Sequence, residues 1–286
     1  MIKAGEKMND FLFFFTNRER DDINKWSNYF EIYERYFSAF RNKSVRFLEI
    51  GVDRGGSSEM WKYYFGNDSV IVGVDINPEC KKFENLEQKR FVEIGDQGDP
   101  EFLKYLVDKY GRFDIILDDG SHFFHHQIKT LELLWDSLTD NGVYLVEDVH
   151  TSYYPGYHGW RLDKNNFMEY SKTLTDDVNR WHCLDFVEGN SMADLYAVHY
   201  YSGIVIFEKK KKSIPYTCRS GGGEACDAVK AAAYAANYAK MASLFRVLSW
   251  YVKVIYYCLI GDKTMCSGYR NSLKARTVLK NSKRHD

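Results

Sequence analysis

The sequence lacks the features that mark several large classes of protein. Its 286 residues carry a formal net charge of −1, so no overall field attracts nucleic acid and we expect no nucleic-acid partner. The six cysteines include no C-x-x-C pair, which argues against a zinc site or a disulfide framework in a chain of this length. The first residues carry several charges and only a short apolar run at 11–15, which does not resemble a secretory signal. These features predict reduced thiols and a cytoplasmic location.

Long apolar runs and internal repeats are also missing. Residues 241–260 come nearest to a membrane span, but they contain Arg246 and Lys253, whereas a spanning helix needs about 20 predominantly apolar residues. Three glycines at 221–223 precede this region, and we predict a C-terminal helical appendage over 224–286. The appendage is expected to pack on the domain or on a partner subunit in a homo-oligomer. The alternative is peripheral contact with the inner face of a membrane, because the tail is basic.

The remaining pattern predicts an α/β domain over 44–212, preceded by an N-terminal helical segment at 1–43. Aromatic residues at helical spacing between 20 and 43 indicate one or two amphipathic helices. Short apolar runs then alternate with segments typical of loops and helices, which favours a parallel sheet covered on both faces. A β-rich hairpin follows at 194–201 and 203–209. Five parallel strands followed by a hairpin are the plan of the class I methyltransferase domain. The five runs are 45–50, 70–75, 91–94, 113–118 and 143–147, and the helices are expected at 57–66, 79–88, 99–110 and 123–138.

A glycine turn after the first expected strand predicts a nucleotide-type cofactor. Gly51 and Gly55 allow the backbone to turn tightly and approach a ligand, and the next helix offers unpaired N–H groups. A dinucleotide-binding fold has glycines here too, but the spacing departs from G-x-G-x-x-G. Glu49 would repel a pyrophosphate and would suit the ammonium and sulfonium charges of S-adenosylmethionine (SAM). We therefore favour SAM.

Acidic residues at later strand ends extend the predicted cofactor site. Asp75 ends the second strand, where it can accept hydrogen bonds from both ribose hydroxyls, and Asp96 follows the third, where the adenine amino group would lie. Ligands bind at the carboxyl ends of the strands in such sheets. The full predicted cofactor set is Glu49, Gly51, Gly55, Ser57, Asp75, Ile76, Gly95, Asp96, Gln97 and Asp118.

Three more acids follow the fourth and fifth strands, which are expected to be neighbours. Asp119, Glu147 and Asp148 can therefore converge, although 28 residues separate the first two. Carboxylates this close repel one another unless a cation lies between them. An all-oxygen set suits a hard divalent ion, Mg²⁺ first and Mn²⁺ as an alternative. Such an ion can lower the pKa of a bound hydroxyl and orient it.

Methylation of an alcohol also calls for a base with a pKa near neutrality, and His122 is the predicted one. It lies three residues beyond Asp119 on the loop leaving the same strand, which would place its imidazole beside the metal. His125, His126 and His150 are alternatives.

The run Asp-Asp-Gly-Ser-His at 118–122 and the run Glu-Asp-Val-His-Thr-Ser-Tyr at 147–153 resemble the Mg²⁺-dependent sugar O-methyltransferases of macrolide antibiotic biosynthesis. They are also similar to the cephalosporin-hydroxylase family on the same scaffold. The resemblance covers about residues 44–210. It implies that Asp119, Glu147 and Asp148 ligate Mg²⁺ and that His122 deprotonates a sugar hydroxyl. The chain departs from the macrolide enzymes in lacking their long N-terminal domain and in carrying its own appendage.

The leading hypothesis is methylation of a sugar hydroxyl on a glycan, polysaccharide or glycosylated metabolite. An aromatic stretch after the fifth strand favours a lid that stacks on sugar faces. Two alternatives are a metal-dependent hydroxylase on the same scaffold and a non-catalytic, membrane-associated interaction protein. The residues expected to contact substrate are His150, Tyr153, Tyr154, Tyr157 and Trp160.

Overall fold

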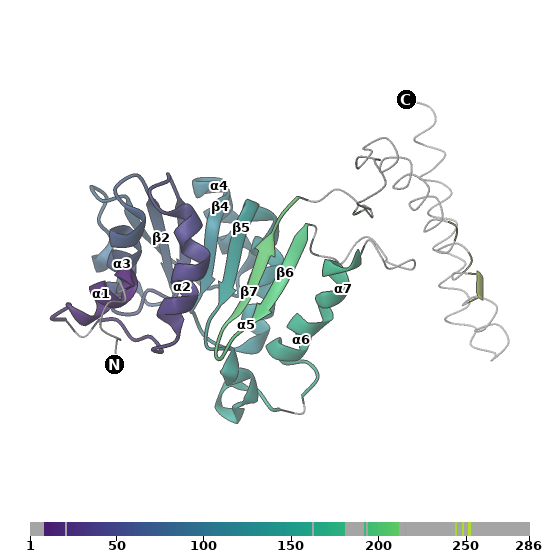
Figure 1. The fold of residues 1–286 in the computed structure, drawn as a ribbon. Coiled ribbons are helices and arrows are strands. Elements are labelled where there is room, and N and C mark those ends of the chain that lie inside the picture. The colour runs from purple at the N-terminus through teal and green to yellow at the C-terminus, as the bar shows by residue number, and fades with distance from the viewer. Residues whose placement is uncertain are drawn as a thin grey trace, which may run out of the picture. The chain divides into compact units, whose positions relative to one another are not determined.

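The apolar runs form a single seven-stranded sheet in the computed structural model (Figure 1). The strand order is β3-β2-β1-β4-β5-β7-β6. The first five strands in this order are parallel, and β7 runs antiparallel to both β5 and β6. This arrangement confirms the predicted class I methyltransferase plan. The strands are β1 (Arg46–Ile50), β2 (Val70–Asp75), β3 (Arg90–Ile94), β4 (Phe113–Asp118), β5 (Leu138–Val146), β6 (Leu195–Tyr200) and β7 (Val205–Lys209).

The structure describes residues 9–211 except 21, 162, 181–191 and 193, together with residues 215, 244, 248, 251 and 252. The helices in this part are α1 (Asp10–Thr16), α2 (Tyr29–Phe37), α3 (Gly56–Phe65), α4 (Pro100–Tyr110), α5 (Phe124–Leu134), α6 (Phe167–Thr173) and α7 (Thr175–Val178). Short 3₁₀ helices are η1 (Ser38–Phe40), η2 (Pro78–Phe83), η3 (Trp135–Ser137), η4 (Val149–Tyr153) and η5 (Pro155–Tyr157).

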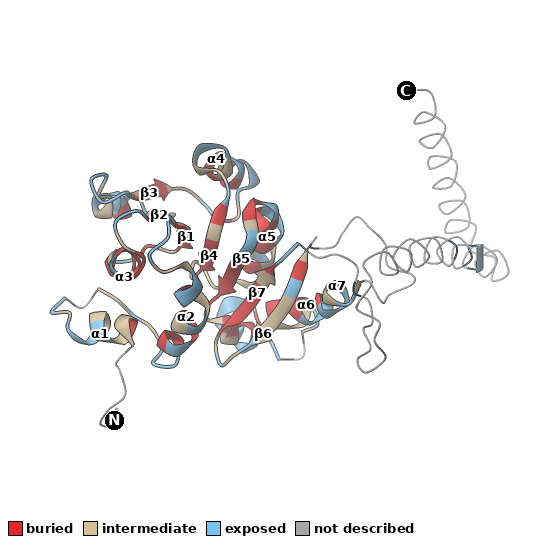
Figure 2. Ribbon diagram, turned by 45° about the horizontal axis from the view of Figure 1, so that its top comes forward, coloured by how far each residue is buried: buried red, intermediate tan, exposed pale blue. Residues whose placement is uncertain are grey.

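Each strand sends alternate side chains to opposite faces of the sheet, and helices cover both faces. Phe47 belongs to the apolar cluster formed with α1, α2 and α3. Its neighbour Leu48 belongs to the cluster formed with α4, α5 and α6. The same alternation recurs at Ile115 and Ile116 on β4. Figure 2 shows the buried residues concentrated on the strands and on the inner sides of these helices. The sheet is therefore the rigid centre on which the loops of the site are built.

Three predicted elements differ from the observed ones. Residues 22–28 contain no helix, and the single helix of the aromatic region begins at Tyr29. The helix expected at 79–88 is only the short η2, which Asn77 caps by accepting from the Glu79 N–H. The segment expected to remain helical to residue 138 ends earlier, because Leu138 pairs with Phe113 and starts β5. The expected hairpin is confirmed as β6 and β7.

The chain divides into two compact units, Met1–Val178 with Ser191–Lys212 and Asn179–Asn190 with Ser213–Asp286. The first unit contains the sheet. The predicted appendage at 224–286 lies outside the described residues, apart from four exposed helical positions: Leu244, Leu248, Tyr251 and Val252. Within the part of the chain that the structure describes, no helix has the length and apolar character to span a membrane.

Candidate active site

The register of the parallel strands brings the predicted site residues to one edge of the sheet. Ile50 at the end of β1 lies opposite Asp118 at the end of β4, and Asp118 lies opposite Val146 at the end of β5. The backbone N–H of Asp119 donates to the Ile50 carbonyl, and that of Glu147 donates to the Asp118 carbonyl, each at 2.9 Å. The loops that leave these three strands therefore start side by side.

A cavity of about 480 Å³ opens at this edge. Six of the ten residues predicted to bind the cofactor line it: Gly51, Asp75, Ile76, Gly95, Asp96 and Gln97. Asp119, His122 and Asp148 line the same cavity. The cofactor pocket and the predicted catalytic group thus share one space.

Gly51 is required by the shape of this pocket. Its φ of +97° belongs to a region that other residues rarely adopt. A Cβ at this position would overlap the carbonyl oxygen of Asp119. Asp75 fixes the loop that follows, because its carboxylate accepts from the backbone N–H groups of Val52 and Asp53 at 2.9 and 3.0 Å.

Glu49 lies outside the pocket lining, contrary to the expectation that its carboxylate faces SAM. It is fully buried and accepts from Ser57 Oγ and Trp61 Nε1, each at 2.9 Å. Burial raises the pKa of Glu49 to about 7, although the charge of Lys25 and these two hydrogen bonds oppose the change. These hydrogen bonds join Glu49 on β1 to Ser57 and Trp61 on α3, which indicates a structural role for Glu49 and Ser57. Gly55 does not line the pocket either and forms the left-handed N-cap of α3.

Asp118 is also buried behind the pocket lining. It accepts from Gln97 Nε2 at 3.2 Å and from the Gly120 N–H at 3.3 Å. The carbonyl oxygen of the Gln97 side chain accepts in turn from the Ser121 N–H at 2.7 Å. Burial raises the pKa of Asp118 to about 7. Asp118 and Gln97 together hold the loop that presents Asp119 and His122.

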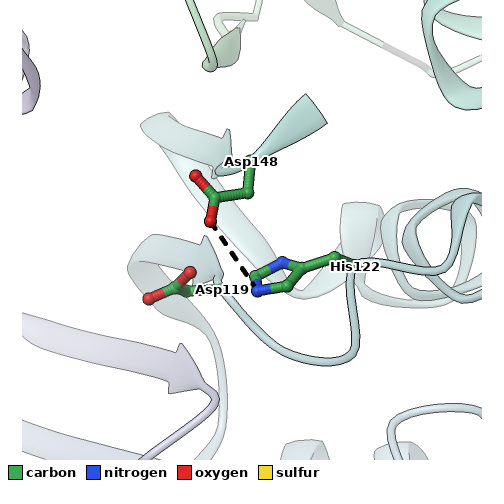
Figure 3. A group of neighbouring side chains, drawn as sticks. All are labelled: Asp119, His122 and Asp148. Carbon is green, nitrogen blue, oxygen red and sulfur yellow. Dashed lines mark ion pairs between the residues drawn. The ribbon is translucent and has the colours of Figure 1, made fainter. Parts of the chain in front are cut away.

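Asp119, His122 and Asp148 form a group that could hold a metal ion (Figure 3). One ligand atom from each lies within 4.8 Å of the others, and His122 Nε2 is 3.8 Å from Asp148 Oδ2. Ligands at about 2.1 Å from one Mg²⁺ lie at most about 4.2 Å apart, so a small inward movement would close the group on an ion. His122 and Asp148 adopt positive φ angles of 58° and 53°, a strained conformation that clusters at functional sites. These residues fit a divalent ion.

Glu147, the third predicted ligand, does not belong to this group within the part of the chain that the structure describes. Its side chain is 1% exposed and accepts from Lys25 Nζ at 2.8 Å and from the hydroxyl of Tyr33. Lys25 Nζ also pairs with Asp119. Burial raises the pKa of Glu147 to about 8, and Lys25 opposes the change. A buried carboxylate needs such donors, and ligation by Glu147 stays a prediction.

The N-terminal segment supplies site residues that the sequence did not reveal. Besides Lys25 and Tyr33, Trp26 Nε1 and the Tyr29 hydroxyl donate to Asp148 Oδ1 at 3.1 and 2.6 Å. Tyr29 and Tyr33 are four residues apart, so their hydroxyls lie on one face of α2. The spacing of these aromatic residues predicts an amphipathic helix and does not reveal that two of their hydroxyls reach the acidic residues. Nothing in the sequence singles out Lys25 among the many lysines.

The aromatic stretch expected to contact substrate reaches the site at two positions. The Tyr157 ring lies 6.2 Å from that of His122, and His150 Nδ1 lies 4.0 Å from Asp148 Oδ1. Tyr154 packs against His150 at 5.5 Å. Tyr153 and Trp160 are exposed and make no aromatic contact with the site within the described ranges.

The alternative bases occupy different positions. His126 lines the pocket and its Nδ1 is 2.8 Å from Ser121 Oγ. His125 is exposed; partial desolvation of its ring where it meets its neighbours, together with the charges of His126 and His158, lowers its pKa. Among these histidines only His122 belongs to the metal group within the described residues.

Comparison with known proteins gives relatives of one kind. No protein-family model matches the chain. An 8-demethyl-8-(2-methoxy-α-L-rhamnosyl)-tetracenomycin-C 3′-O-methyltransferase of Streptomyces olivaceus is 32% identical over 202 residues, which cover 66% of this chain and 50% of that protein. The mycinamicin VI 2″-O-methyltransferase of Micromonospora griseorubida is 39% identical over 135 residues, or 44% of this chain and 33% of that protein.

The solved structures agree with this result. The mycinamycin-pathway methyltransferase MycE, in complex with Mg, SAH and mycinamycin VI, superimposes with a TM-score of 0.63 at 28% identity. The match covers 71% of this chain and 54% of MycE. The chain thus spans about half the length, or less, of the relatives it matches. The comparisons confirm the predicted class I methyltransferase fold and the predicted resemblance to sugar O-methyltransferases.

Proposed function

We propose that this chain transfers the methyl group of SAM to a sugar hydroxyl with the help of a divalent metal ion. The observation that carries the proposal is the convergence of Asp119, His122 and Asp148 on the wall of the cofactor-sized cavity. A volume of about 480 Å³ falls in the range of small-molecule sites, about 300–1,000 Å³. The relatives that share the fold are O-methyltransferases, and MycE binds Mg and SAH.

The pocket walls supply the groups that SAM requires. The tight turn at Gly51 allows close approach of the backbone to the ligand. Asp75 at the end of β2 can accept from ribose hydroxyls through lone pairs left free by the backbone N–H groups. The exposed carboxylate of Asp96 at the end of β3 can accept from the adenine amino group.

The acids and His122 would act on the acceptor. Asp119 and Asp148 offer carboxylate oxygens for a hard cation, which would lower the pKa of a sugar hydroxyl and orient it. With the two carboxylates as the ligands, His122 Nε2 would stay free of the ion and would take the hydroxyl proton, while the hydroxyl oxygen would attack the methyl carbon of SAM and the sulfur–carbon bond would break. Buried Asp118 and Gln97 fix the loop and so the position of His122.

The sugar class is supported by the relatives and by the aromatic surface beside the base. The tetracenomycin relative methylates a rhamnosyl group, as its name states. Tyr157 lies 6.0 Å from Phe123 and 6.2 Å from His122, ring to ring. Such rings can pack on the apolar face of a 6-deoxy sugar next to the hydroxyl to be methylated. A rhamnose-type glycoside is therefore the first acceptor to test.

The hydroxylase alternative is not favoured. Non-haem iron oxygenases use two histidines and one carboxylate, whereas the group found here has one histidine and two carboxylates.

The test is methyl transfer from radiolabelled SAM to rhamnosyl glycosides. We expect activity that EDTA abolishes and that Mg²⁺ or Mn²⁺ restores. Asp119→Asn should lower the rate by roughly 100-fold or more, since it removes a charged ligand. Asp108→Asn, at an exposed surface position, is the matched control and should keep full activity. Transfer that proceeds unchanged in EDTA, or in Asp119→Asn, would exclude the metal mechanism.

A further inference from the structure

The segment between α1 and α2, residues 17–28 and here named the N-terminal strap, reaches into the metal group. The structure describes every residue of the strap except residue 21, and the described residues form no helix or strand. Side-chain contacts hold it in place near both ends. Arg18 Nη2 donates to Glu59 Oε2 on α3 at 2.8 Å, and Asn28 Nδ2 donates to the Ser202 carbonyl at 2.9 Å. Residues 22–26, the middle of the strap, thus cross the site between these two contacts.

Lys25 is the residue that the middle of the strap inserts. Its side chain is 3% exposed, and its ammonium group pairs with both Asp119 and Glu147. A lysine side chain is ordinarily an ammonium cation, and contact with two carboxylates favours that charged form. The structure therefore already places one positive charge among the acids that would hold an ion.

The oxygen atoms of these acids are largely occupied by this arrangement. Both oxygens of Glu147 accept from protein donors, one from Lys25 and the other from Tyr33. One oxygen of Asp119 accepts from Lys25. A divalent ion ligated by Asp119, and by Glu147 as the sequence predicts, would lie close to the ammonium, and the two cations would repel each other beside the nearly buried Glu147.

We propose that Lys25 is a tethered counter-ion of the metal centre: its ammonium joins Asp119 to Glu147, and a divalent ion displaces it together with residues 22–26, the middle of the strap. The inference rests on the proposed metal dependence. It adds which part of the chain moves when the ion binds. Asn24, the neighbour of Lys25, lines the cofactor cavity. Displacement of Lys25 therefore also changes the wall of the cofactor pocket.

The first test measures Mn²⁺ affinity of the full chain by calorimetry and by electron paramagnetic resonance. Lys25→Met, which keeps the length of the side chain and removes the charge, should bind Mn²⁺ at least about tenfold more tightly than the wild type. Lys25→Arg keeps the charge, and Lys104→Met removes an exposed lysine. Both should stay within about threefold of the wild type. Equal or weaker binding by Lys25→Met would overturn the proposal.

The second test needs no substitution and stands even if Lys25→Met does not fold. Hydrogen exchange of the wild-type chain is compared with and without saturating Mg²⁺. Exchange of the backbone amides at 22–26 should become faster with the ion, while exchange in α1 should stay the same. Unchanged or slower exchange at 22–26 would contradict displacement of the strap.

Methyl transfer measured on the same samples separates the two proposals. Mn²⁺ binding without transfer of the methyl group from SAM would refute the proposed function. The ratio of the Mn²⁺ affinities of Lys25→Met and the wild type would still test the role of Lys25. Transfer together with equal affinities would refute only the role of Lys25. An absence of Mn²⁺ binding in both the wild type and Lys25→Met would refute both.

Discussion

Replacement of Glu49 by glutamine gives a sharp test of how the structure positions this residue. The pKa of Glu49 rises from 4.5 to about 7, chiefly because of burial. At about 1.4 kcal/mol for each pH unit, this corresponds to roughly 3 kcal/mol of stability. The folded chain retains a proton that the unfolded chain releases between these pH values. The free energy of unfolding should therefore fall as the pH rises from 4.5 through about 7.

Glu49→Gln stays uncharged throughout this range and should not show that loss. The amide oxygen still accepts from Trp61 or Ser57, and one of the two hydrogen bonds is weakened, which costs about 1 kcal/mol. At pH 8 the variant should thus be more stable than the wild type by about 2 kcal/mol, and near pH 5 slightly less stable. Urea unfolding between pH 5 and 8.5 measures the difference, with the exposed Glu87→Gln as control. A stability difference that does not change with pH would refute the reasoning from burial.

The same variant distinguishes the structural position of Glu49 from the one expected from the sequence. A carboxylate that contacted the ammonium of SAM would contribute about 2 kcal/mol, so its loss would weaken binding by roughly 30-fold. In the structure Glu49 lies outside the pocket, and we expect the Kd of SAM to change by less than about threefold. Calorimetry with SAM at pH 7.5 decides between the two positions.

Two further substitutions test the pocket and the core. Gly51→Ala should abolish SAM binding or weaken it by more than about tenfold, because the added Cβ meets the Asp119 carbonyl at a positive φ. Gly156→Ala is the control, because its Cβ meets open space, and this variant should bind SAM normally. Normal SAM binding by Gly51→Ala would refute the close approach of Gly51 to Asp119. Phe11→Ala should lower the free energy of unfolding by about 3–5 kcal/mol, since the Phe11 ring is fully buried. Urea unfolding measures the loss, with Phe13→Ala as the control because Phe13 is 46% exposed. Equal losses of stability in the two variants would contradict the packing of α1.

The fold could be predicted from sequence because its signals are local and repeated. Runs such as 113–118 are apolar, end in acids or glycines, and alternate with helical segments, which is what a parallel sheet covered on both faces requires. Where local signals compete, the prediction failed. The segment at 79–88 carries helix-forming residues but forms only the short η2. The aromatic spacing between 20 and 43 predicts helix from its start, but residues 22–28 contain none and α2 begins only at Tyr29.

The candidate site could be predicted in part, because strand ends meet at one edge of such a sheet whatever the detailed packing. Adjacency of the strand ends predicts that Asp119, Glu147 and Asp148 converge with His122 beside them. The structure brings one ligand atom each of Asp119, His122 and Asp148 within 4.8 Å of one another, while Glu147 accepts from Lys25 and Tyr33. Adjacency could not decide where each side chain points. Glu49 and Asp118 lie at the same edge, yet burial turns them toward donors behind the pocket.

The sequence by itself thus determined the sheet, the glycine turn and the acidic strand ends, since these depend on periodicity and on residues adjacent in the chain. Only the tertiary structure decided the partner of Glu147. Lys25 and Tyr33 lie more than 110 residues away from it along the chain. No local pattern encodes such a contact, because it arises only when the strap and α2 fold over the carboxyl ends of the strands and bring donors to the buried carboxyl group of Glu147.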